Sequence, residues 1–200
     1  MEWEVVQSVL LGVALAAACG FRAFVPFLVI SIAAHAGHVT LSAGFAWIGT
    51  WPALLAFAVA TALEIAAYYI PWLDNLLDSV ATPAAVVAGI VITASCITGM
   101  SPMLKWTLAV IAGGGAAAIT QGATVVTRAV STATTGGIAN PAVSTCEAGG
   151  SVAVSLLAVL VPVIAAALVV GGLSYGVSKI VRRLRGGPAR DAPAGAEAPG

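Results

Sequence analysis

The sequence predicts an all-α, polytopic helical membrane protein with about five membrane segments, at least one of which is broken or re-entrant. Three observations lead to this fold class. The 200 residues are 60% hydrophobic, with a mean hydropathy of +1.04. Only 8% are charged, against about 25% in a typical soluble domain, which is too few to cover a surface that faces water. Several apolar stretches also have the length of a bilayer crossing.

The first apolar stretch, residues 5–36, is too long for one straight crossing. About 32 residues of helix would measure roughly 48 Å, whereas the hydrocarbon core is about 30 Å thick. Gly20 and Pro26, two residue types that weaken a helix, flank Arg22. A cation at a helix centre costs about 2.5–3.5 kcal/mol, so such residues usually face a protein interior or an aqueous cavity. We expect two half-helices that meet at a polar break, and a single crossing, a double crossing and a re-entrant segment all fit this pattern.

The second segment, residues 51–69, has the clearest boundaries. Trp51-Pro52 opens it with an interfacial aromatic residue and a proline at the first helical position. Tyr68-Tyr69 lies at its other end. About 19 residues give roughly 28 Å of helix, which matches the bilayer.

Three further segments follow. Residues 83–98 are short for a crossing, and we expect them to be tilted, extended by the preceding helical turn, or part of a broken pair. Residues 104–130 form the next segment, and residues 152–177, interrupted by Pro162, form the last. The polar stretch between them, residues 131–151, fits either an external loop or a re-entrant segment whose unwound backbone has local hydrogen-bond partners.

The cations predict the orientation of the chain. Five of the eight lysines and arginines follow the last apolar segment, namely Lys179, Arg182, Arg183, Arg185 and Arg190. The positive-inside rule therefore puts the C-terminus in the cytoplasm, in a bacterial inner membrane. We expect a helical membrane domain over residues 1–185 and a disordered cytoplasmic tail over residues 186–200, where Pro, Gly and Ala dominate. Five crossings place the N-terminus and the stretch 131–151 outside, whereas a re-entrant or doubly crossing first segment moves the N-terminus inside.

The polar residues in or beside the apolar segments are the candidate functional residues. We expect them to line a polar interior or a substrate path: Arg22, Glu64, Asp74, Asp78, Arg128, Asn140 and Glu147. Buried charges persist mainly when they are paired, so one interpretation is that they hold the bundle together. The other is that they bind or relay an ion, a proton or an anionic head group. We predict that Arg22 pairs with a carboxylate of another segment, with Glu147 and Asp78 preferred to Glu64.

The sequence contains no pattern typical of an enzyme, a cofactor site or a metal site. His35 and His38 lie three residues apart, but no third ligand is near them in sequence. The three cysteines form no CxxC pair. No Ser-His-Asp arrangement, phosphate-binding loop or nucleotide signature occurs. We therefore predict no catalytic residue, no cofactor and no nucleic-acid partner.

Several short motifs occur in a fixed order between about Leu11 and Pro162. They are Gly20-Phe21-Arg22-Ala23 with Pro26, Pro71-Trp72-Leu73-Asp74-Asn75 with Asp78, Thr127-Arg128, and Asn140-Pro141 with Ser144 and Glu147. This ordered set resembles a family of small bacterial inner-membrane proteins that is catalogued only as a domain of unknown function. The resemblance implies a polytopic helical protein and supplies no activity. The chain departs from the family pattern at Gln121 and Thr124, where members often carry His and Lys, so a cluster of several cations for one anion is less expected here.

The function that we expect is a small transporter or channel-like permease for an ion or small solute. Its partners would be the lipid bilayer and that solute. A second copy of the chain would be a further partner if the GxxxG pattern from Gly172 to Gly176 packs between chains rather than within one. One alternative is a non-catalytic membrane scaffold or assembly subunit, and another is a handler of anionic lipid head groups. A wet cavity around Arg22 favours transport, dry and fully paired charges favour a scaffold, and a lateral opening at head-group depth favours the lipid handler.

Overall fold

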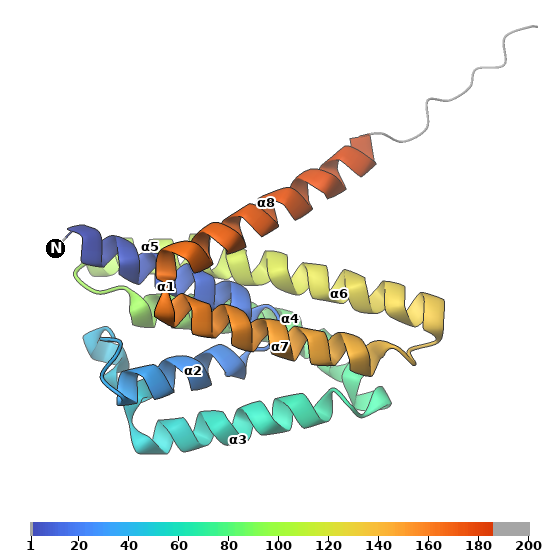
Figure 1. Cartoon of the computed structure of the whole chain (residues 1–200), viewed down its shortest axis with the longest axis horizontal. Helices are drawn as coiled ribbons and strands as arrows, with labels where there is room; N and C mark the ends of the chain where they lie inside the picture. Colours follow the sequence, from blue (N-terminus) through green and yellow to red (C-terminus); the bar gives the residue numbers. More distant parts are fainter. Residues whose placement is uncertain (1, 186–200) are drawn as a thin grey trace, which may run out of the picture.

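The computed structural model describes residues 2–185, without the side chains of residues 71–79, 180 and 183–185. Helices are the only regular secondary structure in this part of the chain, which confirms the predicted fold class. They are α1 (Glu2–Cys19), α2 (Phe24–His35), the 3₁₀-helix η1 (Ala43–Gly49), α3 (Trp51–Ala67), α4 (Pro71–Cys96), α5 (Pro102–Leu108), the π-helix η2 (Ala109–Gly114), α6 (Gly115–Thr135), α7 (Asn140–Leu160) and α8 (Pro162–Arg185) (Figure 1).

The lengths of these helices suit a membrane. Within the described residues, four helices are long and apolar enough to cross one: α1, the continuous helix from Pro102 to Thr135, α7, and α8 as far as Lys179. The number becomes five if η1 and α3, which are bent by 67° relative to each other, form one span. The number five agrees with the sequence prediction, but the segments differ. α7 and α8 replace one predicted segment, and the predicted third segment, residues 83–98, lies mainly in a shorter apolar helix that is not in this count.

The predicted break in the first apolar stretch is present. α1 ends at Cys19 and α2 begins at Phe24. α2 then runs antiparallel to α3, as contacts at both ends show. The backbone N–H of Ala23, just before α2, donates to Glu64 near the end of α3 (2.7 Å). At the other end of α2, the ring of His35 stacks on that of Trp51, at the start of α3, with 5.4 Å between the ring centroids. Figure 1 shows that α1 starts at the same end of the bundle at which α2 finishes. The two helices therefore form a hairpin, with its turn inside the bundle.

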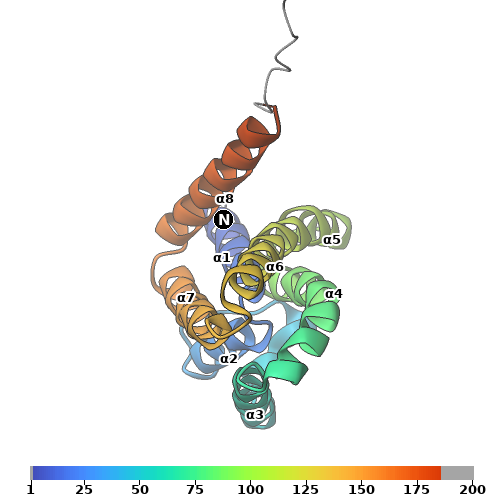
Figure 2. The ribbon, with the colours of Figure 1, turned by 90° about the vertical axis from the view of Figure 1, so that its right-hand side faces the viewer.

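α1 is the central helix of the bundle. It packs against α4, α6, α7 and α8, which surround it in Figure 2. Small residues allow the close approach of its neighbours. Gly12 lies against Thr93 of α4, whose hydroxyl donates to the Gly12 carbonyl oxygen (3.1 Å), and Gly20 lies against Ala117 and Thr120 of α6. The end of α1, which leads into the turn, is consequently fixed on several sides.

The polar stretch at residues 131–151 was expected to be an external loop or a re-entrant segment with unwound backbone, but most of it is helical. α6 continues to Thr135, the chain turns at residues 136–139, and α7 begins at Asn140. The hydroxyl groups explain the difference, because Thr134 and Thr135 donate to carbonyl oxygens one turn earlier in α6 and so need no loop partners. Gly136 and Gly137 end α6 with positive φ angles of 65° and 89°, a conformation that favours glycine.

The last predicted segment is also two helices rather than one. α7 ends at Leu160 and α8 begins at Pro162, and the chain reverses its direction between them (Figure 1). Proline disfavours a helical conformation in the residue before it, and Val161 has φ −143° and ψ 77°. α8 then leaves the bundle at an angle, toward the end that holds the turn at residues 136–139.

The polar stretch at residues 73–79, before the short third segment, belongs to a helix as well. α4 starts at Pro71 and passes through Pro83, so the short third segment is extended by the turns that precede it. This was one of the arrangements that the sequence allowed. The predicted tail, residues 186–200, lies outside the described residues.

Gly20 tests the packing of α1 on α6. A Cβ atom added to Gly20 would lie 2.5 Å from Cβ of Thr120 and 2.7 Å from the carbonyl oxygen of Ala117. We expect Gly20→Ala to lower the free energy of unfolding by about 1–3 kcal/mol, measured by chemical denaturation in detergent micelles. Gly122→Ala on α6 is the matched control, because nothing lies near that position, and it should leave stability unchanged or raise it by up to about 1 kcal/mol. Equal stability of the two variants would contradict the close contact.

Candidate functional site

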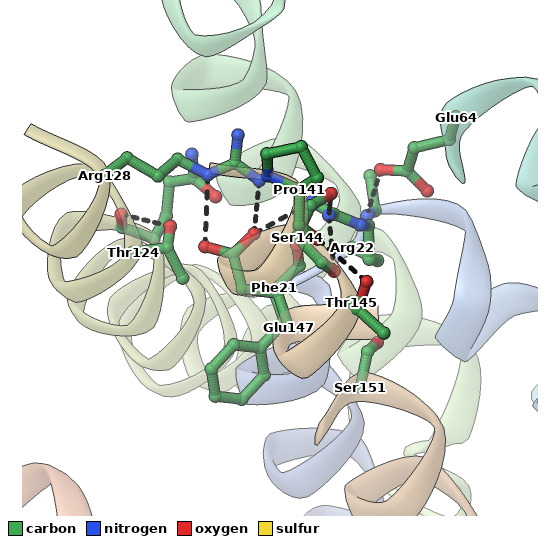
Figure 3. Close-up of polar contacts among 12 residues, drawn as sticks. Phe21, Arg22, Glu64, Thr124, Arg128, Pro141, Ser144, Thr145, Glu147 and Ser151 are labelled. Carbon is green, nitrogen blue, oxygen red and sulfur yellow. Dashed lines mark hydrogen bonds and ion pairs between the residues drawn. The ribbon is translucent and has the colours of Figure 1, made fainter. Parts of the chain in front are cut away.

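Glu147 is the centre of a buried ionic cluster. It lies two turns into α7, and its carboxylate is shared by two arginines from different parts of the fold (Figure 3). Nε of Arg128, on α6, donates to Oε1 (3.1 Å), and Nη2 of Arg128 pairs with Oε2. Nη1 of Arg22, in the turn between α1 and α2, lies 3.2 Å from the same Oε2. One carboxylate therefore joins α7 to α6 and to the break in the first apolar stretch.

This cluster is buried on all sides. Arg22 is 2% exposed, Arg128 3% and Glu147 6%. The effective cost of burying an ion is several kcal/mol, and only well-placed partners offset it. Nη2 of Arg22 supplies two more hydrogen bonds, to the carbonyl oxygen (3.0 Å) and the hydroxyl (2.5 Å) of Ser144. The predicted pairing of Arg22 with Glu147 is confirmed.

Tyr68 lies against both guanidinium groups. Cζ of Arg22 is 3.9 Å and Cζ of Arg128 is 4.3 Å from the centroid of its ring. A desolvated cation over an aromatic ring gains about 2 kcal/mol or more. The sequence places Tyr68 only at the end of the second predicted segment, and this residue is 5% exposed. Its spacing of four residues from Glu64 places both on one face of α3, and this signal could have identified it.

Glu64 was the third choice of carboxylate partner for Arg22, and it has a different role. Its Oε1 accepts the backbone N–H of Ala23 (2.7 Å) and its Oε2 accepts that of Phe24 (3.0 Å). The first N–H groups of a helix have no partner within it, and a negative charge near them is favourable. Glu64 therefore caps α2 from a neighbouring helix. Among the side chains that the structure describes, no cation forms an ion pair with it.

A cavity of about 520 Å³ lies beside Glu64, between α3 and α4. One face of α3, residues 80–85 of α4 and the turn at residues 20–23 contribute to its walls. Most of the described side chains that line it are apolar, and the polar ones include Glu64, Tyr68 and Gln121. Leu63 and Val80 at its edge are 66% and 59% exposed, so the cavity opens on the outer surface of the bundle.

The seven candidate residues fall into three groups. Arg22, Arg128 and Glu147 form the cluster, and Glu64 lies beside it at the start of α2. Asn140 is two turns away from Glu147, where its amide donates to the hydroxyl of Thr132 (3.2 Å) and links the ends of α7 and α6. The side chains of Asp74 and Asp78 lie outside the described residues, so their predicted place in the site is untested.

Comparison with known families gives a match over residues 9–182 to a family described as a domain of unknown function (DUF4126). The matched range includes the ionic cluster, Glu64 and the residues that line the cavity. No curated protein and no solved structure matches the chain.

The loss of Arg22 should be costly. Arg22→Ala removes one ion-pair partner of Glu147, two hydrogen bonds to Ser144 and the contact with Tyr68. Breaking a buried pair by removing one partner typically costs about 3–5 kcal/mol, and we expect a loss of this size in the free energy of unfolding in detergent. Arg182→Ala, at an exposed position of α8, is the control and should stay within about 0.5 kcal/mol of the unchanged protein. An Arg22→Ala variant as stable as this control would argue for a solvated, unpaired arginine.

Proposed function

The chain belongs to the DUF4126 family, and from that premise we propose that it is a small transporter or permease whose solute site is the cavity between α3 and α4. The family supplies no activity, so the proposal rests on one observation. A cavity of about 520 Å³ is lined both by the break between α1 and α2 and by Glu64, a carboxylate on the apolar helix α3. Its volume lies in the range of about 300–1,000 Å³ that is usual for small-molecule sites. An ionisable residue within a membrane helix is expensive and most often functional.

In this proposal α1 and α2 are a re-entrant hairpin, and five segments cross the membrane: α3, α4, the helix from α5 to α6, α7 and α8. Backbone outside a helix is tolerated at membrane depth only where protein buries it or where it lines a cavity. The turn at residues 20–23 meets both conditions, because Glu64 accepts the N–H groups of Ala23 and of Phe24 directly after it, and Ala23 lines the cavity. Interrupted helices of this kind commonly hold the binding sites of transporters.

The same five crossings set the orientation. With the C-terminal cations in the cytoplasm of a bacterial cell, the turn at residues 136–139 is cytoplasmic and the N-terminus is outside. This places the turn on the side opposite to the one expected from the sequence, because α7 and α8 are two crossings where one was predicted.

A membrane scaffold is the second candidate, and the burial of the ionic cluster favours it. Arg22 and Arg128 are both bound to Glu147 and are 2% and 3% exposed. Neither arginine is among the residues that line the cavity, which leaves the handling of anionic head groups with less support than the other two functions.

Accessibility of Ala23 separates transporter from scaffold. We expect a cysteine at Ala23, in a variant that lacks the three native cysteines, to react with a small membrane-impermeant thiol reagent from one side of the membrane. Ala18→Cys is the buried control, because Ala18 is 0% exposed and should not react. Ile138→Cys, in the turn at residues 136–139 and 87% exposed, should react only from the cytoplasmic side. An Ala23 cysteine that stays unreactive from both sides would leave the scaffold as the better explanation.

A further inference from the structure

We propose that the cavity between α3 and α4 binds organic monocations with apolar bodies, such as lipophilic amines or quaternary ammonium and phosphonium ions, and that Glu64 recognises their charge. This inference rests on the proposed function and names the substrate class of the same site. Three features of the cavity carry it: the sign of its charge, the nature of its walls and the place where it opens.

The charge argument concerns Glu64. Among the described residues that line the cavity, Glu64 alone carries a charge. Each of its oxygen atoms accepts one backbone N–H, whereas a carboxylate offers about four acceptor sites. A protonated amine can therefore donate a hydrogen bond to Glu64, and a quaternary ammonium or phosphonium ion is attracted by charge alone. Arg22 is close by, but its guanidinium is bound to Glu147 and Ser144. Because the surroundings are apolar, attraction between Glu64 and a cation is stronger than it would be in water.

The walls exclude a bare metal cation and favour an organic one. Hard cations such as Ca²⁺ take about six to eight oxygen ligands, and among the described residues far fewer polar side chains line the cavity. Phe21 and Phe24 lie on either side of the Arg22-Ala23 pair and also line the cavity. Their rings can bind an organic cation through its positive charge and its apolar groups together. The rest of the walls, mainly alanine with Leu63 and Val80, suits an apolar body.

The opening of the cavity fits a ligand that is dissolved in the lipid. Leu63 and Val80 at the edge are exposed on the outer surface of α3 and α4, which faces the hydrocarbon in the proposed topology. A lipophilic cation that partitions into the membrane can therefore enter from the side, in addition to the aqueous access to Ala23 that the proposed function requires, and it reaches Glu64 without passing the ionic cluster.

Two ions of the same shape and opposite sign test the inference. Tetraphenylphosphonium and tetraphenylborate can each be titrated against the purified full-length protein in detergent by isothermal calorimetry. We expect saturable binding of the phosphonium and none of the borate. Preference for the borate, or equal binding of both ions, would overturn the assignment of a cation site.

Two pairs of variants locate the binding. Glu64→Gln should weaken phosphonium binding by about tenfold or more, because the attraction between the carboxylate and the cation in apolar surroundings is lost. Glu2→Gln, at an exposed position of α1, should have no effect. Ala67→Phe fills the cavity and keeps Glu64, so it should abolish binding even if Glu64→Gln fails to fold. Ala66→Phe, on the exposed face of α3 beside it, should bind normally. Binding that survives in both Glu64→Gln and Ala67→Phe would place the ion elsewhere and overturn the inference.

The outcome also separates this inference from the proposed function. If neither ion binds but the Ala23 cysteine reacts from one side, the cavity is a solute site of another class and only the cation assignment is wrong. If neither ion binds and the Ala23 cysteine is unreactive from both sides, both the cation assignment and the transport proposal are wrong.

Discussion

The fold depends on one carboxylate that two arginines share. Glu147 binds Arg22 and Arg128 in the interior of the bundle, where each charge would be costly alone. Arg22 reaches Glu147 from the turn between Cys19, where α1 ends, and Phe24, where α2 begins. The pairing therefore holds this turn against α7, and the chain reverses its direction directly after Arg22. The central position of α1 and the packing of Gly20 on α6 place the turn where this contact forms.

The same turn connects the structural cluster to the cavity. On one side of it, Arg22 is held by Glu147, Ser144 and Tyr68. On the other side, the N–H groups of Ala23 and Phe24 are held by Glu64, which faces the cavity. The two acidic residues thus have separate tasks. Glu147 neutralises buried cations, whereas Glu64 caps a helix and lines the cavity. The proposed solute site therefore does not require the ionic core to open.

Much of the first segment could be predicted because its signals are local. An arginine between a glycine and a proline, in an apolar stretch too long for the bilayer, indicated the break, and the cost of an unpaired charge indicated a carboxylate partner. The boundaries of α6 and α7 were missed because serine and threonine suit both loops and helices, and Thr134 and Thr135 bind their own helix. The cavity and the place of Tyr68 depend on how α3 packs beside α4 and the turn, which no spacing along the chain determines. That Asp74 and Asp78 line the polar interior stays a prediction, because their side chains lie outside the described residues.

The most direct test of this account is the coupling between Arg22 and Glu147. The free energies of unfolding of the unchanged protein, Arg22→Ala, Glu147→Gln and the double variant, measured under one set of detergent conditions, form a double-mutant cycle. Residues in direct ionic contact show coupling energies of about 0.5–3 kcal/mol, and burial of this pair predicts a value in the upper half of that range, with the double variant less damaged than the sum of the single ones. Additive losses, with a coupling energy near zero, would contradict the claim that this pair holds the break in place.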